Sequence, residues 1–166
     1  MKVIVNADDY GFHGNANQAI AKCFRDGVVT NTTAMVTMPA IEAGIALARK
    51  EGFADRIGLH INLSEGTPLT DKIKRCRIFC DAEGNFNGYI RSNRLWRFWL
   101  PRSVLGAVAD EIKAQMRKFI DFGLKERHYD SHGQVCVYWP ILPVALECAK
   151  EFGFISTRMF INMSAN

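Results

Sequence analysis

The sequence predicts an α/β protein with a parallel β-sheet or barrel. Short apolar, β-branched segments alternate with segments whose apolar residues recur at helical spacing, and this alternation is typical of parallel strands joined by crossover helices. Glycines stand where the helical segments end, at the place of a C-terminal cap. Acidic residues and histidines stand at the expected carboxyl ends of three strands, which is where α/β proteins carry their sites.

The first half of the chain has the pattern of a β-α-β-α-β unit. Residues 2–7 contain the apolar run Val-Ile-Val and predict the first strand, and residues 16–24 carry one apolar face and predict a helix. The β-branched residues 32–38 predict a second strand, residues 41–48 a second helix and residues 56–63 a third strand.

The second half begins with an expected insertion at residues 64–100, which is rich in glycine, proline and aromatic residues. A proline then opens a long amphipathic helix at residues 101–122. A fourth strand is expected at residues 127–131, a further helix at residues 140–152 and a fifth strand at residues 154–160. Insertions of this length often carry function, because rigid strands hold them over a site.

Size and charge limit the classes of protein that fit. The 166 residues suit a single domain, residues 1–166, with its own core. The net charge of +4 is spread along the chain, so no nucleic-acid partner is expected. The amino-terminal apolar run is too short for a signal peptide and no stretch is long enough to span a membrane, so we expect a soluble, cytoplasmic protein with free thiols.

Three groups of polar residues fall at the expected carboxyl ends of parallel strands. They are Asp8 and Asp9 after the first strand, His60 on the third, and His132 after the fourth. One carboxylate and two imidazoles suit a divalent cation and leave coordination positions open, as catalytic sites do. We therefore expect Asp9, His60 and His132 to bind a metal ion.

Asp8 has a different expected role. A carboxylate beside the ligand set can act as the general base that takes a proton from the attacking water, which suits hydrolysis of an amide or ester. Each residue taken alone also has a structural interpretation. The Asp8 segment resembles a strand-to-helix turn, His60 a core histidine and His132 a loop residue.

Four ordered motifs resemble those of a known family, the YdjC-like carbohydrate deacetylases, which include the bacterial chitooligosaccharide deacetylases. They are Val-Asn-Ala-Asp-Asp-Tyr-Gly (5–11), Thr-Asn-Thr-Thr-Ala-Met-Val (30–36), Ile-Gly-Leu-His (57–60) with Gly-Thr-Pro-Leu-Thr (66–70), and His-Tyr-Asp-Ser-His (128–132). Together they cover residues 3–132, and their order makes the resemblance specific.

The resemblance implies a divalent-metal hydrolase that removes N-acetyl groups from acetylated sugars or chitooligosaccharides. It implies a truncated form of an incomplete, TIM-like (β/α) barrel and an ion that is most often Mg²⁺, with Zn²⁺ as the alternative. By matching motifs, Asp9, His60 and His132 fall on the family's metal positions and Asp8 on its proposed base.

Two departures from the family pattern leave other functions open. The family commonly has Ser-His-x-His-x-His, whereas this chain has Gln134 and Cys136 at the second and third histidine positions. The chain also ends at residue 166, while barrel enzymes run to about 250 residues. A fragment, or a short form that covers its open sheet edge as a homo-oligomer, would explain this length.

These departures favour, as the alternative, a catalytically weakened metal- or sugar-binding homologue, and another metallohydrolase such as a phosphoesterase also stays open. The aromatic and arginine residues of the insertion fit a contact with sugar rings or an interface with another protein. They include Tyr89, Arg94, Trp96 and Trp99.

Overall fold

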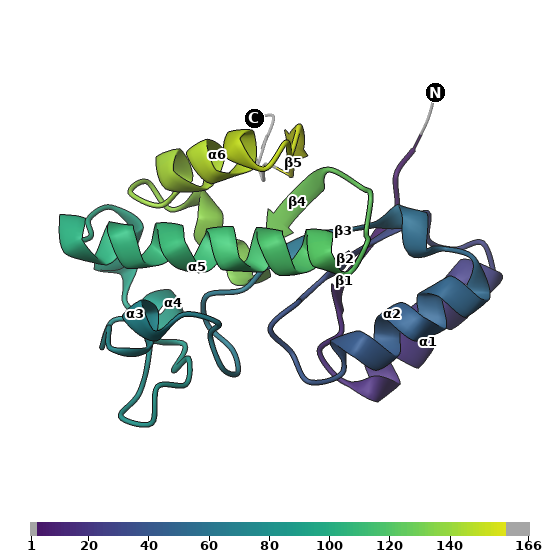
Figure 1. Cartoon of the computed structure of the whole chain (residues 1–166), viewed down its shortest axis with the longest axis horizontal. Helices are drawn as coiled ribbons and strands as arrows, with labels where there is room; N and C mark the ends of the chain where they lie inside the picture. Colours follow the sequence, from purple (N-terminus) through teal and green to yellow (C-terminus); the bar gives the residue numbers. More distant parts are fainter. Residues whose placement is uncertain (1–2, 159–166) are drawn as a thin grey trace, which may run out of the picture.

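The computed structural model describes residues 3–158 as a parallel sheet with helices packed against it (Figure 1). The five strands lie side by side in chain order and each neighbouring pair is parallel. This confirms the α/β class with a parallel sheet. Within the described residues the sheet is open, with β1 and β5 at its edges. The strands are β1 (Asn6–Tyr10), β2 (Asn31–Ala34), β3 (Ile57–Ile61), β4 (His128–Ser131) and β5 (Ser156–Thr157).

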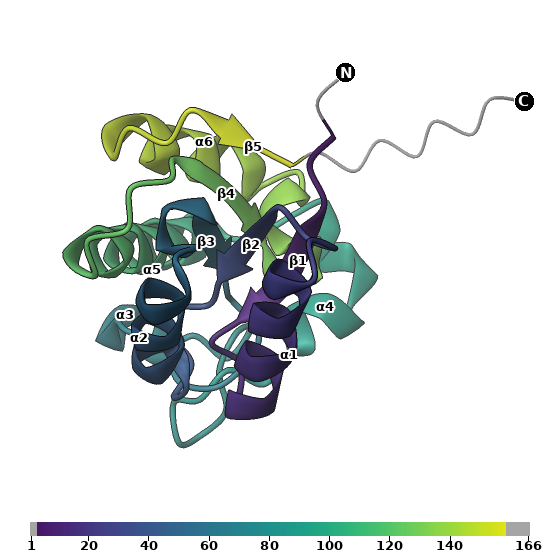
Figure 2. The same ribbon diagram turned by 90° about the vertical axis from the view of Figure 1, so that its right-hand side faces the viewer.

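Helices α1, α2, α5 and α6 lie where the sequence predicts crossovers between these strands. Figure 2 shows α2, α5 and α6 one after another alongside the strands, and α1 packs against α2 as α5 packs against α6. No helix among residues 3–158 combines the length and apolar character needed to cross a bilayer. The α-helices are α1 (Gly14–Arg25), α2 (Ile41–Glu51), α3 (Asp71–Lys74), α4 (Tyr89–Ser92), α5 (Arg102–Asp121) and α6 (Leu142–Glu151), and the 3₁₀ helices are η1 (Ala54–Arg56), η2 (Arg94–Arg97) and η3 (His132–Val137).

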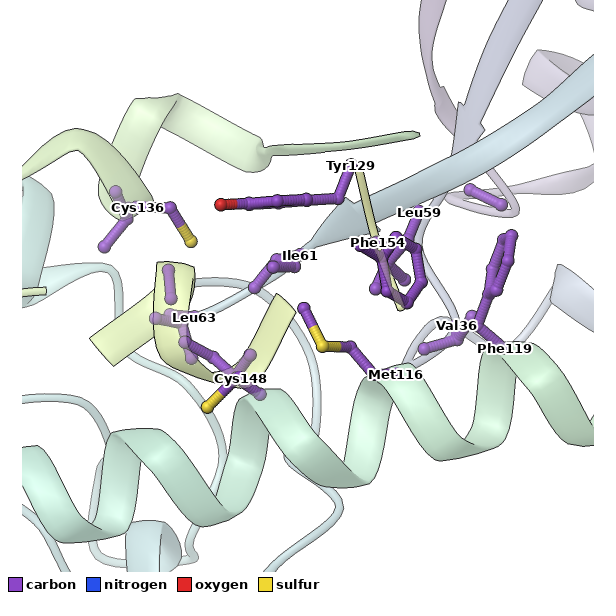
Figure 3. Packing of buried hydrophobic residues seen from close by; sticks show 14 of the residues in the cluster. Val36, Leu59, Ile61, Leu63, Met116, Phe119, Tyr129, Cys136, Cys148 and Phe154 are labelled. Carbon is purple, nitrogen blue, oxygen red and sulfur yellow. The ribbon is translucent and has the colours of Figure 1, made fainter. Parts of the chain in front are cut away.

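The core lies between the sheet and α5, and it determines which face of β3 is free for a site. Leu59 and Ile61 point from β3 toward Met116 and Phe119 of α5 (Figure 3), and all four side chains are fully buried. Successive residues of a strand point to opposite faces, so His60 points away from this core. The packing of β3 against α5 therefore presents the histidine on the other face of the sheet.

The limits of several strands differ from the sequence prediction. Strand β1 starts at Asn6, where pairing with β2 begins, and not at residue 2. The apolar Val3 and Ile4 lie beyond the paired part and are exposed, because β propensity alone does not make a strand without a partner. Strand β1 also extends to Tyr10 and does not end at residue 7, so Asp8 and Asp9 lie inside β1 rather than after it.

The other predicted strands were also too long. Strand β2 ends at Ala34 and not at residue 38, and β3 comprises Ile57–Ile61 within the predicted 56–63. The fifth strand was predicted at residues 154–160, and β5 comprises only Ser156–Thr157. Residues 159–160 lie outside the described residues.

The segment at residues 64–100, which the sequence predicts as an insertion, is anchored to α5 by a buried carboxylate. Glu111 is fully buried and accepts hydrogen bonds from the backbone N–H groups of Leu69 and Thr70 and from the Thr70 hydroxyl. A buried carboxylate needs such donors. The Gly-Thr-Pro-Leu-Thr motif is therefore attached to the scaffold at this point.

A candidate metal centre at the strand ends

The three residues expected to bind a metal ion lie next to one another in the folded chain. A carboxylate oxygen of Asp9 lies 3.1 Å from His60 Nε2 and 2.8 Å from His132 Nδ1. The candidate ligand atoms all lie within 4.8 Å of one another. They come from β1, from β3 and from the first residue of η3, all at the carboxyl ends of strands. One oxygen and two nitrogens in such a cluster suit a divalent cation.

A bulge in β1 brings both aspartates to this centre. Ala7 pairs with Thr32 and Tyr10 pairs with Ala34, so β1 contains one more residue than β2 in this stretch. Asp9 has a φ of 66°, in the left-handed region, which costs a non-glycine residue roughly 1–2 kcal/mol. In a regular strand neighbouring side chains point to opposite faces. The bulge instead places Asp8 near His60 too, in a second cluster that includes Asp130.

His60 is held by a carboxylate on the neighbouring strand. Its Nδ1 makes a short hydrogen bond with Asp130 and lies 3.2 Å from the Thr33 hydroxyl. The pairing of β3 with β4 sets His60 directly opposite Asp130. With Nδ1 engaged, Nε2 faces Asp9, and this is the usual arrangement in which a second carboxylate orients a metal-binding imidazole.

The charges of the centre shift the pKa values of its groups. Burial lowers the pKa of His60, but hydrogen bonds to Asp130 and Asp9 outweigh it and raise the pKa to about 9. The hydrogen bond from His132, followed by that from His60, holds the pKa of Asp9 well below its usual range. Without an ion, His60 therefore keeps a proton, and a metal ion would compete with this proton for the ring nitrogen.

Asp8 is positioned by two polar side chains. One carboxylate oxygen accepts a hydrogen bond from the Asn6 amide at 2.8 Å, and the other lies 2.6 Å from the Arg158 guanidinium. Arg158 also lies 2.6 Å from Asp130, so one arginine joins Asp8 to the carboxylate that holds His60. Sequence reasoning did not assign a role to Asp130 or Arg158. The position of Asp130 in the His-Tyr-Asp-Ser-His motif could have identified it as a site residue, whereas no motif marked Arg158.

The insertion supplies two further groups to the centre. His132 Nε2 lies 3.3 Å from the Arg91 guanidinium and 3.9 Å from the Glu65 carboxylate. The Phe12 ring stacks over the His132 ring at a centroid distance of 6.3 Å. The insertion thus closes one side of the centre, as expected for a long connection above strand ends.

Gln134 and Cys136 occupy the two positions at which the family commonly has further histidines, and one is exposed while the other is buried. Cys136 is buried beside the core (Figure 3), and burial raises the pKa of its thiol to about 12. Gln134 is exposed and has a φ of 60°. The Cys136 side chain is therefore absent from the group of candidate ligands, and Gln134 is exposed to solvent.

The fold and this centre define a parallel α/β protein with a carboxylate and two imidazoles at the carboxyl ends of its strands. The model of the family described as YdjC-like protein matches residues 2–165, and the chain belongs to this family.

Proteins named carbohydrate deacetylase resemble the chain over most of its length. The protein from Brevibacillus brevis is 36% identical over 152 residues, which are 92% of this chain and 57% of that protein. One from Vibrio cholerae serotype O1 is 38% identical over 92% of this chain and 56% of the relative. The chain thus spans little more than half the length of these relatives.

A crystal structure of a candidate cellobiose-phosphate cleavage protein from Enterococcus faecalis V583 has a similar fold. The TM-score is 0.79 and the sequence identity 26%, with 96% of this chain and 59% of that chain covered.

Proposed function

We propose that the chain carries the catalytic centre of a metal-dependent carbohydrate deacetylase, which hydrolyses the N-acetyl group of an acetylated sugar or chitooligosaccharide. This proposal rests on the convergence of Asp9, His60 and His132 at the carboxyl ends of the strands. It also rests on the relatives of the chain, which are named carbohydrate deacetylases. The ion is Mg²⁺ in the first instance, with Zn²⁺ as the alternative.

The residues fit a divalent ion in number, type and support. Three protein ligands leave positions open for water and substrate. Asp130 orients the His60 ring, as a second carboxylate does in many metal centres. When bound, the ion would polarise the acetyl carbonyl and make a nearby water more acidic.

Asp8 is the general base in this proposal. Its carboxylate lies within 4.8 Å of the candidate ligand atom of His60, and Asn6 and Arg158 fix its direction. Asp8 would take the proton of the attacking water as the water oxygen bonds to the acetyl carbon, and the protonated Asp8 would give this proton to the amine nitrogen as the C–N bond breaks. Acetate and a free amino sugar are the products.

A weakened, binding-only homologue is the second candidate. In this chain the Cys136 side chain is buried in the core cluster, so an imidazole expected from the family pattern is replaced by a buried thiol. Asp8 would then have to protonate the leaving amine without help from such an imidazole, and turnover would be low.

A phosphorylated sugar is another candidate substrate, because the similar E. faecalis protein is named for cleavage of cellobiose phosphate. Arg91 and Arg97 line a groove beside His132, and guanidinium groups bind phosphate well. Phosphate release in place of acetate release would support a phosphoesterase.

The test is acetate release from di-N-acetylchitobiose with Mg²⁺, with Zn²⁺ and with EDTA. Asp8→Asn should lower the rate about 10²-fold to 10⁴-fold while ion binding, measured by calorimetry, is retained. Asp9→Asn should weaken both. Asp26→Asn, at an exposed carboxylate paired with Lys22, is the matched control and should change neither. Ion binding without acetate release would support the second candidate, and full activity in EDTA would refute the proposal.

A further inference from the structure

His132 has groups of opposite hydrogen-bonding character at its two ring nitrogens. Nδ1 lies 2.8 Å from a carboxylate oxygen of Asp9, and Nε2 lies 3.3 Å from the Arg91 guanidinium. An ionised carboxylate only accepts hydrogen bonds and a guanidinium only donates them. One form of the neutral ring satisfies both contacts, and this form carries its proton on Nδ1 and a lone pair on Nε2.

This form of the ring opposes the proposed role of His132 as a metal ligand. A metal ion binds an imidazole nitrogen through its lone pair, and the other nitrogen then donates its N–H to an acceptor. Nδ1 is the nitrogen that faces Asp9, with which His132 would share the ion. His132 can therefore bind through Nδ1 only when its proton is on Nε2, where Arg91 offers no acceptor.

A carboxylate that can accept the Nε2–H of His132 lies beside Arg91. A Glu65 carboxylate oxygen is 3.9 Å from His132 Nε2 and 3.4 Å from the Arg91 guanidinium. The side chains of Arg91 and Glu65 are 42% and 39% exposed, so both have room to turn. The His132 ring itself is stacked on Phe12. A small rotation of Arg91 and Glu65 would therefore replace the donor at Nε2 with an acceptor.

Buried or closely packed neighbours hold both side chains near the ring. Asn62 is fully buried, and its amide group accepts a hydrogen bond from the Glu65 N–H at 3.0 Å and donates one to the Glu65 carbonyl at 2.6 Å. Arg91 lies so close to Gly133 that a Cβ there would be 2.5 Å from Arg91 Nε. Only the ends of the two side chains are therefore left to exchange places.

We propose that Arg91 and Glu65 are positioning residues of His132 with opposite effects on ion binding. Arg91 holds the ring with its proton on Nδ1 and lowers the ion affinity, whereas Glu65 accepts the Nε2–H and raises it, as Asp130 does from its side of His60. The exchange moves the proton from one nitrogen of the ring to the other, so the ring gains and loses none. The proposal rests on the proposed function for the ion, and it goes further in giving the segment at residues 64–100 control over ion affinity.

Nitrogen-15 NMR of histidine-labelled protein at one slightly alkaline pH measures the proton position, because a ring nitrogen with a proton and one with a lone pair have well separated shifts. In the ion-free wild type the His132 proton should be on Nδ1, and saturation with Zn²⁺ should move it to Nε2. Arg91→Met keeps an unbranched side chain and removes the donor, so part of the ion-free population should move to Nε2–H. Comparison with His132→Gln assigns the signals.

Calorimetry with Mg²⁺ and with Zn²⁺ measures the effect on ion affinity. Arg91→Met should lower the Kd about 3-fold to 10-fold. Arg94→Met, at an exposed arginine three residues further along, is the matched control for charge and should stay within about 2-fold of the wild type. Glu65→Gln and Glu65→Asp should both raise the Kd about 10-fold to 100-fold, and because Glu65→Asp keeps the charge, its loss reports the contact.

The proposal is overturned if the ion-free ring carries its proton on Nε2, or if the Zn²⁺-bound ring keeps it on Nδ1. It is also overturned if Arg91→Met or Glu65→Asp binds the ion like the wild type, or if Arg94→Met lowers the Kd as much as Arg91→Met. Circular dichroism checks that each variant is folded. Ion binding that depends on Arg91 and Glu65 without acetate release would refute the proposed function and leave their assignment standing, whereas a wild type that binds no ion would refute both.

Discussion

The ion-free protein should lose stability as the pH rises, because folding raises the pKa of His60. The side chain is 2% exposed, and its two ring nitrogens face Asp130 and Asp9. Burial opposes protonation, but these two carboxylates outweigh it and raise the pKa from 6.5 to about 9. The stabilisation is therefore complete below pH 6.5 and disappears as the pH rises through 9. This shift corresponds to about 3 kcal/mol of unfolding free energy, of which roughly 2 kcal/mol should be lost between pH 6.5 and 8.5.

Urea unfolding of EDTA-treated protein, followed by circular dichroism from pH 6 to 8.5, measures this loss. The range stops at 8.5 because burial raises the pKa of the Cys80 and Cys136 thiols to about 12, so ionisation of these thiols in the unfolded chain destabilises the fold at higher pH. His60→Gln should remove most of the pH dependence. His13→Asn should keep it, because His13 is an exposed N-cap of α1 and asparagine also caps helices. An unfolding free energy of the wild type that stays level or increases over this range would refute the reasoning.

Further outcomes follow from the same contacts. Ion affinity should increase from pH 6 to 9 because His60 must lose its proton to bind, and calorimetry at several pH values would show this; a level profile would contradict it. Asp130→Asn should weaken ion binding about 10-fold to 100-fold, and unchanged affinity would mean that Asp130 does not orient His60. Gly133→Ala should lower the unfolding free energy by roughly 1–2 kcal/mol, because φ is +59° and the new Cβ would meet Arg91. Phe119→Ala should cost about 3–5 kcal/mol, since this side chain is fully buried, and a loss below 1 kcal/mol in urea unfolding would contradict the core described above.

The sequence predicted the candidate metal ligands, because these residues stand at the ends of expected strands. Asp9, His60 and His132 were selected because each stands at the expected carboxyl end of a parallel strand, and the structure places them within reach of one another. The residues that hold them were not assigned. Asp130 contacts His60 only because β3 and β4 pair in one register, and register depends on two segments that lie 70 residues apart.

The backbone conformation of the site was likewise not predicted from the sequence. Asp9 has a left-handed φ inside a strand, although local pattern favours a regular strand or a turn. The bulge exists because β1 is paired with β2 on both sides of it, and the pairing compensates for the strain. Arg158 reaches Asp8 from a segment 150 residues away, and no spacing rule predicts such a contact.

The amino-acid sequence by itself determined the α/β class, the order of helices and strands, and the residue types that meet at the strand ends. These follow from hydrophobic periodicity and from glycines and prolines at element ends, which act over a few residues. Tertiary structure alone decided where each strand begins and ends, how the two aspartates of β1 are turned, and which groups hold His60 and Asp8. These depend on pairing and hydrogen bonds between segments that are far apart in the chain, and such contacts form only when the whole sheet has assembled.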